Sequence, residues 1–454
     1  MRSPFIRSKS ININMLDKFF GARDDMTDTP SNLQDSIQND ERLGLDSSDR
    51  KLLVFELGYT GHYSSYLRHL AEYWCKHQLP GHLDIVVSPS FVKHHGEVLE
   101  IAASCQQNNL NFVAITPAEE ASLIPRKSSM NRALRSFQEW KLLRKYATQL
   151  GATHCLLLYF DSFQSAIASG AKLPCPFSGI YFRPTFHYRT FAGYVPSWRN
   201  RLQHWREKFV ILPRIMNHPQ LRSLFCLDPF VVKPMERFRS KASAIHLPDP
   251  VQIYGVPKQH DLKTFKESLG IEPGRTVFLL FGALYDGRKG VHQVLDAISA
   301  LSPDLCQKLC LLLVGQLGDN SPIPAQLAEL SQNLPLQAII RDGFVPEQDV
   351  QLYFQSADVI LAPYQRHIGM SGILVQAAAA GRPLLSTNYG LMGEITRCWQ
   401  LGLAVDATDP SEIAKGLTRF LLESSDELSD RTKMAAFAEL NSAEHFASLI
   451  FQYT

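Results

Sequence analysis

The stretch ADVILAPYQRHIGMSGILVQAAAAGRPLLSTNYGLMGE, residues 357–394, shows the pattern strand, glycine turn, helix. Its apolar run 359–362 predicts a buried strand, and HIGMSG leads into a helix that begins at about Ile373. The helix is rich in alanine, is capped by Gly381 and stops at Pro383, after which LLS returns as a strand. This pattern is typical of a doubly wound α/β domain.

The turn HIGMSG predicts a place for a phosphate group. Its glycine and serine residues leave backbone amides free to approach a ligand, and the start of a helix adds a partial positive charge. The predicted contacts are Gly369, Met370, Ser371 and Gly372. The alternative is an ordinary turn of a doubly wound domain, which needs no ligand.

Length and composition favour two domains. The chain has 454 residues, 45% of them hydrophobic, which is too long for one ordinary core and enough to bury two. No apolar run approaches the ~18 to 20 residues that cross a bilayer, and the first residues lack the hydrophobic segment of a secretory signal. We therefore expect a cytosolic protein. The eight cysteines form neither a CxxC pair nor a zinc-type cluster, so reduced, buried thiols and no metal are expected.

The net charge of +2 conceals an asymmetry. Residues 125–241 contain 20 Lys plus Arg against 5 Asp plus Glu, whereas the rest of the chain contains 26 against 39. A strongly basic segment attracts an anionic membrane, an acidic polymer or phosphate groups. Nucleic acid is not expected, because no nucleic-acid motif accompanies the charge.

Four segments are predicted. Residues 1–50 are polar with little periodicity and predict a disordered extension. Residues 51–250 and 251–435 each alternate buried strands with helices, and they predict an N-terminal and a C-terminal Rossmann-like domain. Residues 436–454 predict a terminal helix.

In the first domain, functional residues are expected where strands end, because ligands of open α/β sheets gather at the carboxyl ends of strands. LLVFELG is followed by a glycine turn, HCLLLYFD ends in an aspartate, and GIYFRPTFHY ends in an arginine and a histidine. The resulting candidates for contact with a ligand are Gly61, His62, Asp161, Arg183 and His187. For His187 a packed or surface position is an open alternative.

Residues 197–225 interleave tryptophan and other apolar residues with basic ones. Such a segment can lie on a membrane interface, with the basic side chains toward head groups and tryptophan toward the acyl boundary. The alternative is a basic, solvated helix packed on the core. The sequence leaves both open.

The second domain opens with TVFLLFGALYDGRKGVHQVLDAI, which predicts a strand, a glycine-rich loop and a helix. Lys289 in this loop is a candidate for contact with phosphate, since its ammonium is a compact positive charge. The alternative is a surface lysine in a turn. Gly282 and Arg288 belong to the same loop.

SADVILAP, SGILVQAAAAGRPLLST and NYGLMGEI resemble the donor-binding half of glycosyltransferase family 4, a family with the GT-B fold. The resemblance covers residues 276–421 well and the rest loosely. It implies two doubly wound Rossmann-like domains facing across a cleft, a nucleotide-sugar donor and transfer with retention of configuration. It also implies a catalytic role for Lys289 and His187, and contact of Gly343, Phe344 and Val345 with the nucleotide base. The acceptor side it implies is formed by Gly61, His62, Asp161 and Arg183.

The chain departs from the family pattern at three positions. The family carries two glutamates eight positions apart, of which the second contacts the nucleotide ribose and the first a sugar hydroxyl. These positions hold Gln376 and Ile368 here, and Ala283 stands where the family has an arginine. Gln376 can still hydrogen-bond a ribose, whereas Ile368 cannot bond a sugar.

The sequence thus predicts a glycosyltransferase that acts on a nucleotide sugar and a glycan or lipid-linked acceptor hydroxyl, with no cofactor beyond that co-substrate. Peripheral contact with the inner face of an anionic membrane through residues 125–241 is part of this prediction. The alternative is a non-catalytic GT-B protein that binds a sugar nucleotide, a glycan or a partner protein, because both glutamates and the arginine are missing.

Overall fold

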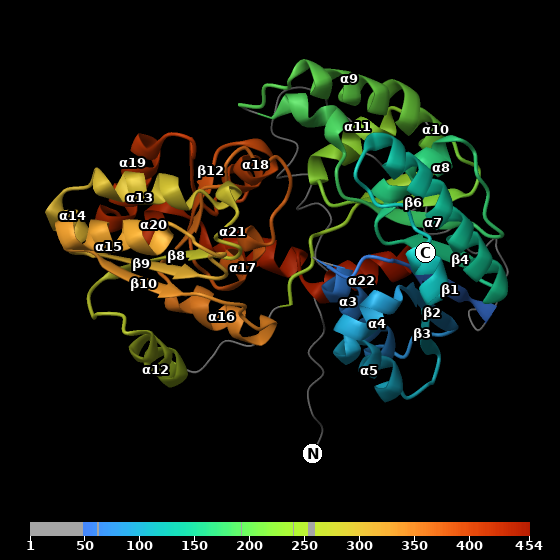
Figure 1. The fold of residues 1–454 in the computed structure, drawn as a ribbon, viewed down its shortest axis with the longest axis horizontal. Coiled ribbons are helices and arrows are strands. Elements are labelled where there is room, and N and C mark those ends of the chain that lie inside the picture. The colour runs from blue at the N-terminus through green and yellow to red at the C-terminus, as the bar shows by residue number, and fades with distance from the viewer. Residues whose placement is uncertain (1–48, 61–62, 192, 239, 253–258) are drawn as a thin grey trace. The chain divides into compact units, whose positions relative to one another are not determined.

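The computed structural model describes residues 49–454 except 61–62, 192, 239 and 253–258. The predicted extension, residues 1–50, lies almost entirely outside the described residues, and so do Gly61 and His62. Two separate parallel sheets account for all the named strands of the described part of the chain (Figure 1).

The first sheet has seven strands in the order β3-β2-β1-β4-β5-β6-β7, and every neighbouring pair is parallel. The strands are β1 (Lys51–Phe55), β2 (His82–Val87), β3 (Leu110–Ala114), β4 (His154–Leu157), β5 (Phe177–Tyr181), β6 (Leu221–Cys226) and β7 (Ser243–His246). The order reverses between β1 and β4, so the loops after these two strands flank the topological switch point of the sheet.

Helices cover both faces of the first sheet. One face packs against α3 (Tyr63–Lys76), α4 (Pro89–His94), α5 (Gly96–Ser104) and α22 (Ala443–Gln452), and the other against α7 (Ser129–Gln149), α8 (Gln164–Ala168), α10 (Leu212–Met216) and α11 (Val232–Glu236). The terminal helix α22 therefore shares a core with α3, to which it contributes Phe446 and Ile450. Two further helices, α6 (Pro117–Ala121) and α9 (Trp198–Arg206), lie outside these cores, and the π-helical turn η5 (Glu207–Ile211) continues α9. Among the described residues, this half of the chain also contains the short 3-10 turns η3 (Phe160–Phe163), η4 (Thr185–Thr190) and η6 (Pro229–Val231), and the second half contains η7 (Gly287–Lys289).

The second sheet has six parallel strands in the order β10-β9-β8-β11-β12-β13. They are β8 (Thr276–Phe281), β9 (Leu309–Val314), β10 (Gln337–Arg341), β11 (Val359–Ala362), β12 (Leu384–Thr387) and β13 (Gly402–Val405). Its switch point lies between β8 and β11. Both strands were predicted from their apolar runs, and the helix after β11 begins at Ile373 as expected.

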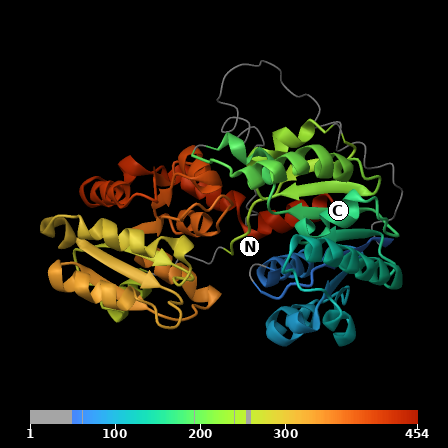
Figure 2. The ribbon, with the colours of Figure 1, turned by 45° about the horizontal axis from the view of Figure 1, so that its top comes forward.

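Helices also cover both faces of the second sheet, and Figure 2 shows its yellow and orange strands between them. One face packs against α13 (Val291–Ser299), α14 (Pro303–Cys306), α15 (Ile323–Asn333), α19 (Pro410–Leu422) and α20 (Ser425–Leu428), and the other against α12 (Gln259–Leu269), α16 (Glu347–Ser356), α17 (Ile373–Ala379), α18 (Gly390–Cys398) and α21 (Arg431–Leu440). Strand β9 is uniformly apolar because it is buried on both faces of the sheet. Its consecutive residues Leu311 and Leu312 enter the cores on opposite faces, so every position must be apolar.

On α7, Leu134 and Phe137 are exposed, because Glu139 and Trp140 take the inner face of the helix, where Glu139 pairs with Arg126 at 2.8 Å. One expectation from the sequence was wrong, since the predicted reduced thiols are absent at one pair of cysteines.

Cys75, near the end of α3, and Cys105, after α5, form a disulfide with their Cα atoms 5.2 Å apart. The other six cysteines are free. A spacing of 30 residues carries no pairing signal in the sequence, since only the packing of α3 against α5 brings the two sulfurs together.

Candidate functional site

Two loops meet at the switch point of the second sheet. The loop after β8 carries residues 282–290, and the loop after β11 carries residues 363–372. Because β8 and β11 are hydrogen-bonded neighbours, their carboxyl ends place the two loops side by side. The two phosphate contacts predicted from separate stretches of sequence therefore lie in one place.

Lys289 folds back over the end of β8. Its Nζ donates a hydrogen bond to the carbonyl oxygen of Phe281 at 3.0 Å and a second one to the hydroxyl of Tyr364. The ammonium also lies 4.4 Å from the centre of the Tyr364 ring, and only 8% of the residue is exposed. An ammonium has three N–H donors, so one remains for a ligand. The lysine is thus a held, largely desolvated charge rather than a surface lysine in a turn.

No carboxylate of the described residues lies within ion-pair distance of the Lys289 ammonium. The nearby Asp286 instead pairs with Arg288, whose Nε lies 3.0 Å from Asp286 Oδ2. A hydrogen bond from the backbone amide of Arg288, with help from its guanidinium, lowers the pKa of Asp286. The positive charge of Lys289 is therefore not cancelled by its own loop.

Tyr364 connects the two loops. Its hydroxyl oxygen accepts one hydrogen bond from Lys289 and another, 3.2 Å long, from the hydroxyl of Ser371. With both lone pairs used, the phenolic proton is left to donate to a third group. Sequence reasoning missed this residue, because a tyrosine two positions beyond a buried strand gives no signal of its own.

The segment 369–372 leaves its backbone amides accessible. These residues are partly exposed, and their amides donate no hydrogen bond to another described residue. The helix that follows is short, so the local amides and the Ser371 hydroxyl, rather than a long helix dipole, are what this segment offers to an anion.

A glycine is required beneath the Lys289 side chain. Gly282 has φ +118°, and a Cβ atom there would lie 2.7 Å from Lys289 Nζ. A larger residue would thus be strained in its backbone and would collide with the ammonium. Gly282 therefore leaves the space that the Lys289 ammonium occupies.

Gln376 lies on α17, where its Oε1 accepts a hydrogen bond of 2.6 Å from Nε2 of Gln351. Its side chain is therefore held by a neighbour on α16, and its own amide nitrogen can serve another acceptor. Ile368 is packed among apolar side chains and offers no polar atom from its side chain. Beyond β10, Gly343 adopts φ +130°, and the Phe344 side chain is 82% exposed, next to a half-buried Val345.

On the first sheet, Asp161 joins two strand ends. Its carboxylate accepts hydrogen bonds from the backbone amides of Phe182 at 2.8 Å and Arg183 at 3.1 Å. Loss of solvent around the carboxylate raises the pKa of Asp161 to about 6. The side chain of Arg183 is exposed.

His187 is buried among the rings of Phe186, Tyr188 and Phe191. Its Nε2 lies 2.9 Å from Asp228 Oδ2, although the two groups lack the alignment of a hydrogen bond. The His187 side chain is thus packed, and its catalytic role stays a prediction.

Glu56 follows β1 at the switch point of the first sheet and was not predicted. Its Oε1 accepts a hydrogen bond of 2.7 Å from the amide of Gly58. Burial raises the pKa of Glu56 to about 8. Its position directly after the apolar run LLVF was the available signal.

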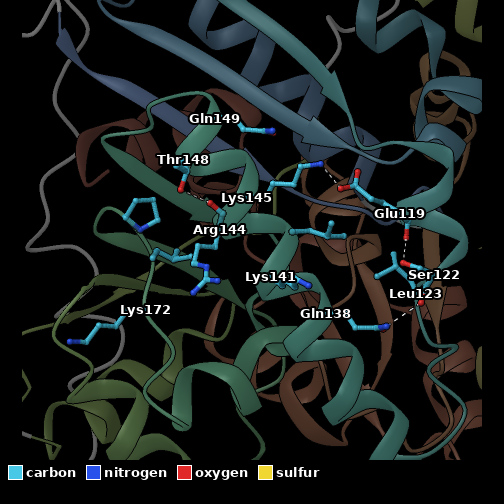
Figure 3. A pocket seen from close by; sticks show the side chains of 13 residues that line it. Glu119, Ser122, Leu123, Gln138, Lys141, Arg144, Lys145, Thr148, Gln149 and Lys172 are labelled. Atoms are coloured by element: carbon cyan, nitrogen blue, oxygen red, sulfur yellow. Dashed lines mark hydrogen bonds and ion pairs between the residues drawn. The ribbon is translucent and has the colours of Figure 1, made fainter.

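A groove of about 880 Å³ lies elsewhere, along α7. Figure 3 shows its basic side chains, with Lys145 paired to Glu119 at 2.6 Å. None of the predicted site residues lines it: it is formed by Glu119, Ser122, Leu123, Gln138, Lys141, Leu142, Arg144, Lys145, Thr148, Gln149, Lys172, Leu173 and Pro174. Its volume alone therefore does not make it the functional site.

Neither a metal centre nor a membrane span is found among the described residues. No group of three or more His, Cys, Asp or Glu side chains is placed there to hold a metal ion. No helix of this part of the chain combines the length and apolar character needed to cross a bilayer.

Residues 275–423, which contain both loops of the second switch point, match the family model of glycosyl transferases group 1. The C-terminal domain is a group 1 glycosyltransferase domain. This identity agrees with the family resemblance of the sequence. Among curated relatives, the D-inositol 3-phosphate glycosyltransferase of Nocardioides sp. is 28% identical over 242 residues, which cover 50% of this chain and 49% of the relative. The chain thus spans about half the length of the curated relatives it matches.

Solved glycosyltransferases share the fold of the whole described chain. Sucrose-phosphate synthase from Thermosynechococcus elongatus has a TM-score of 0.62 at 16% identity, covering 89% of this chain and 98% of its own. HepE from Anabaena, solved in complex with UDP, has a TM-score of 0.60 at 11% identity, with coverage of 89% and 98%. At such identities the similarity shows the fold alone, and it confirms the predicted GT-B fold.

Proposed function

We propose that this protein transfers a sugar from a nucleotide-sugar donor to an acceptor hydroxyl. The observation that carries the proposal is the hydrogen-bonded chain Lys289, Tyr364, Ser371 at the switch point of a group 1 glycosyltransferase domain. It combines one uncancelled ammonium with hydroxyl and amide donors. This is the set of groups that stabilises the charge developing on a leaving diphosphate.

In this reaction the bond between the anomeric carbon and the diphosphate oxygen breaks, and its electron pair leaves with the diphosphate. The acceptor oxygen forms the new bond to the anomeric carbon. We infer retention of configuration from the family resemblance, with the departing phosphate taking the proton of the acceptor hydroxyl. No side-chain nucleophile, metal or cofactor is then required beyond the nucleotide-sugar donor and the acceptor.

The remaining donor contacts follow the same resemblance. Gln376 would orient the ribose, and the loop 343–345 would contact the base through its backbone and the exposed Phe344 ring. The UDP complex of HepE supports a nucleotide as ligand of this fold. On the acceptor side we retain Arg183, Asp161, Gly61 and His62 as predictions.

A second candidate function is binding at the donor site without turnover. Its support is the pair Ile368 and Gln376, which replaces both family glutamates and leaves one sugar hydroxyl without its usual partner. A non-catalytic protein that binds a sugar nucleotide, a glycan or a partner protein would have the same fold.

Two measurements on the purified protein separate these functions. Thermal-shift profiles against UDP-, GDP- and ADP-sugars report binding, because a ligand of the folded state stabilises it. Donor hydrolysis or transfer reports catalysis. Stabilisation with hydrolysis supports the enzyme, and stabilisation without hydrolysis supports the binding protein. No stabilisation by any of the three would contradict both the transferase and a protein that binds a sugar nucleotide without turnover.

The basic segment adds a proposal about location. We propose that residues 125–241 bring the protein to an anionic membrane surface, with the cytosol as the compartment. The excess of 15 positive charges in this segment, 20 less 5, supports attraction to such a surface.

A further inference from the structure

Helix α9 and the turn η5 expose a row of large apolar side chains. Trp198 is 70% exposed, Leu202 59%, Trp205 55% and Phe209 60%. Their spacing of four, three and four residues places them within about 60° of one another around a helix. The sequence left open whether this segment packs on the core or faces outward, and these four side chains face outward.

Basic side chains border this apolar row on both sides. The same helical geometry places Arg199 and Arg206 along one edge and Arg201 and Lys208 along the other. The Arg199 guanidinium lies 5.3 Å from the Trp198 ring, and the Lys208 ammonium 5.4 Å from the Phe209 ring. The long basic side chains therefore lie beside the rings with their charges at the edge of the apolar surface.

The opposite side of the helix is anchored. Glu207, the sole acidic residue between 198 and 211, is buried. It accepts hydrogen bonds from the hydroxyls of Tyr181 and Thr185 and, at 3.0 Å, from the amide of Thr185. His204 is also buried, with its Nε2 3.3 Å from the Tyr194 hydroxyl. The helix cannot turn its apolar row inward without breaking these bonds.

We propose that α9 and η5 form a membrane-docking element, with an anionic lipid bilayer as its partner. A bilayer interface accommodates tryptophan at the acyl boundary and basic side chains at the head groups, which is the arrangement on this face. The complete absence of exposed acidic side chains on the segment favours an anionic surface over a neutral one. Figure 1 shows α9 on the outside of the first domain.

The docking element also bears on the acceptor. Thr185, which holds Glu207, lies two residues from Arg183 at the end of β5. Docking would therefore bring this predicted acceptor side toward the lipid. On the proposed function, on which this step rests, the acceptor class favoured is a hydroxyl carried on a lipid.

The protein reports docking through its own fluorescence. Of its five tryptophans, Trp74, Trp140 and Trp399 are buried, whereas Trp198 and Trp205 are exposed. Mixing the protein with vesicles of phosphatidylcholine and phosphatidylglycerol should shift the emission to the blue, and the protein should sediment with the vesicles. Pure phosphatidylcholine vesicles should bind it more weakly, and added salt should weaken binding to the anionic vesicles.

The decisive variant is Trp198→Ser/Trp205→Ser, which keeps every charge. We expect its partition onto anionic vesicles to fall by about tenfold or more, because the apolar area entering the interface is lost. Arg199→Ser/Arg206→Ser should reduce binding to anionic vesicles and leave the weak binding to neutral ones. Leu422→Ser is the matched control, since Leu422 is 64% exposed on α19 and should change neither.

Three results would overturn the inference: a wild-type protein that does not bind anionic vesicles, a double tryptophan variant that binds as well as wild type, or a wild-type dimer that this variant converts to a monomer. The last result would assign the apolar row to a second copy of the chain. Donor hydrolysis without vesicles should be equal in wild type and variant, so failure of docking is distinguishable from failure of the proposed transferase.

Discussion

Two lysine-aromatic pairs in this protein show that burial changes what a lysine beside an aromatic ring can bind. Lys289 lies 4.4 Å from the Tyr364 ring centre at the switch point of the second sheet, and Lys208 lies 5.4 Å from the Phe209 ring on η5. The first lysine is 8% exposed and is held by two hydrogen bonds, whereas the second borders an exposed ring.

The difference lies in solvent. A desolvated charge with fixed donors interacts strongly with one anion in one position, because no water reorganises when the charge of the ligand develops. An exposed charge on a flexible stem is screened by salt and gains little from any single partner. Lys289 therefore suits a single diphosphate, and the basic residues of α9 and η5 suit a surface with many anions.

The largest effect should come from removing the buried charge. Lys289→Ala should lower nucleotide-sugar turnover by about 100-fold or more, because a fixed donor to the developing charge is lost. Lys308→Ala, an exposed lysine before β9, is the control and should leave turnover unchanged. Steady-state kinetics, with circular dichroism to verify folding, test this. Wild-type turnover in a folded Lys289→Ala protein would remove Lys289 from the site.

A smaller effect should follow from displacing the ammonium without deleting it. Gly282→Ala places a methyl group against Lys289 Nζ at a backbone φ of +118°. We expect turnover to fall by about 30-fold and the melting temperature to fall as well, since left-handed backbone costs an alanine about 1 to 2 kcal/mol. Gly287→Ala has open space around the new methyl group and should be nearly silent in both measurements.

Removing the Tyr364 hydroxyl, which connects the two loops, should lower activity by a still smaller factor. Tyr364→Phe keeps the ring beside Lys289 and removes the hydroxyl that receives hydrogen bonds from Lys289 and Ser371. A hydrogen bond to a charged group contributes about 1.5 to 3 kcal/mol, so we expect about a tenfold fall in kcat/KM. If Ser371→Ala has the same effect as Tyr364→Phe and the double variant adds nothing, the two hydroxyls act as one unit.

The smallest effect concerns the buried carboxyl group of Glu56. Burial raises the pKa of Glu56 to about 8, so the protonated carboxyl is favoured in the folded state. Stability from this group is present below the unfolded pKa of 4.5 and is lost as the pH rises toward 8. Glu56→Gln, which can keep the bond to Gly58, should therefore raise the melting temperature by about a few degrees at pH 8 and little at pH 4.5.

Glu423→Gln is the matched comparison for Glu56→Gln. Glu423 is fully exposed, and its hydrogen bond with Arg419 lowers its pKa. Its replacement should not stabilise the protein at pH 8. A Glu56→Gln protein with the same pH dependence of melting temperature as wild type would show that the Glu56 carboxylate is not disfavoured by burial.

Much of the second domain was predictable because its signals are local. The apolar runs of β8 and β11 are buried on both faces, so their residues are apolar without interruption, and turn residues mark where they end. The glycine turns before α13 and α17, and hence Lys289 and Ser371, were found in this way. The contact between them through Tyr364 was not, since strand order joins loops that are about 80 residues apart.

The first domain was less predictable because its decisive facts are contacts between distant segments. The sequence does not distinguish a histidine that faces a ligand from one that is packed in the protein. His187, for example, is packed beside Asp228. The same holds for Cys75 and Cys105, whose pairing depends on how α3 meets α5.

By itself, the sequence determined that this protein has two doubly wound α/β domains, that its second domain belongs to the glycosyltransferases and that one segment is strongly basic. These properties depend on periodicity, turn residues and composition, which can be seen in the sequence alone. Only the tertiary structure decided that Lys289 is a held, buried charge linked to Ser371, and that the apolar residues of α9 face outward. Burial depends on which segments meet, and that is set by strand order and helix packing rather than by any residue's neighbours in sequence.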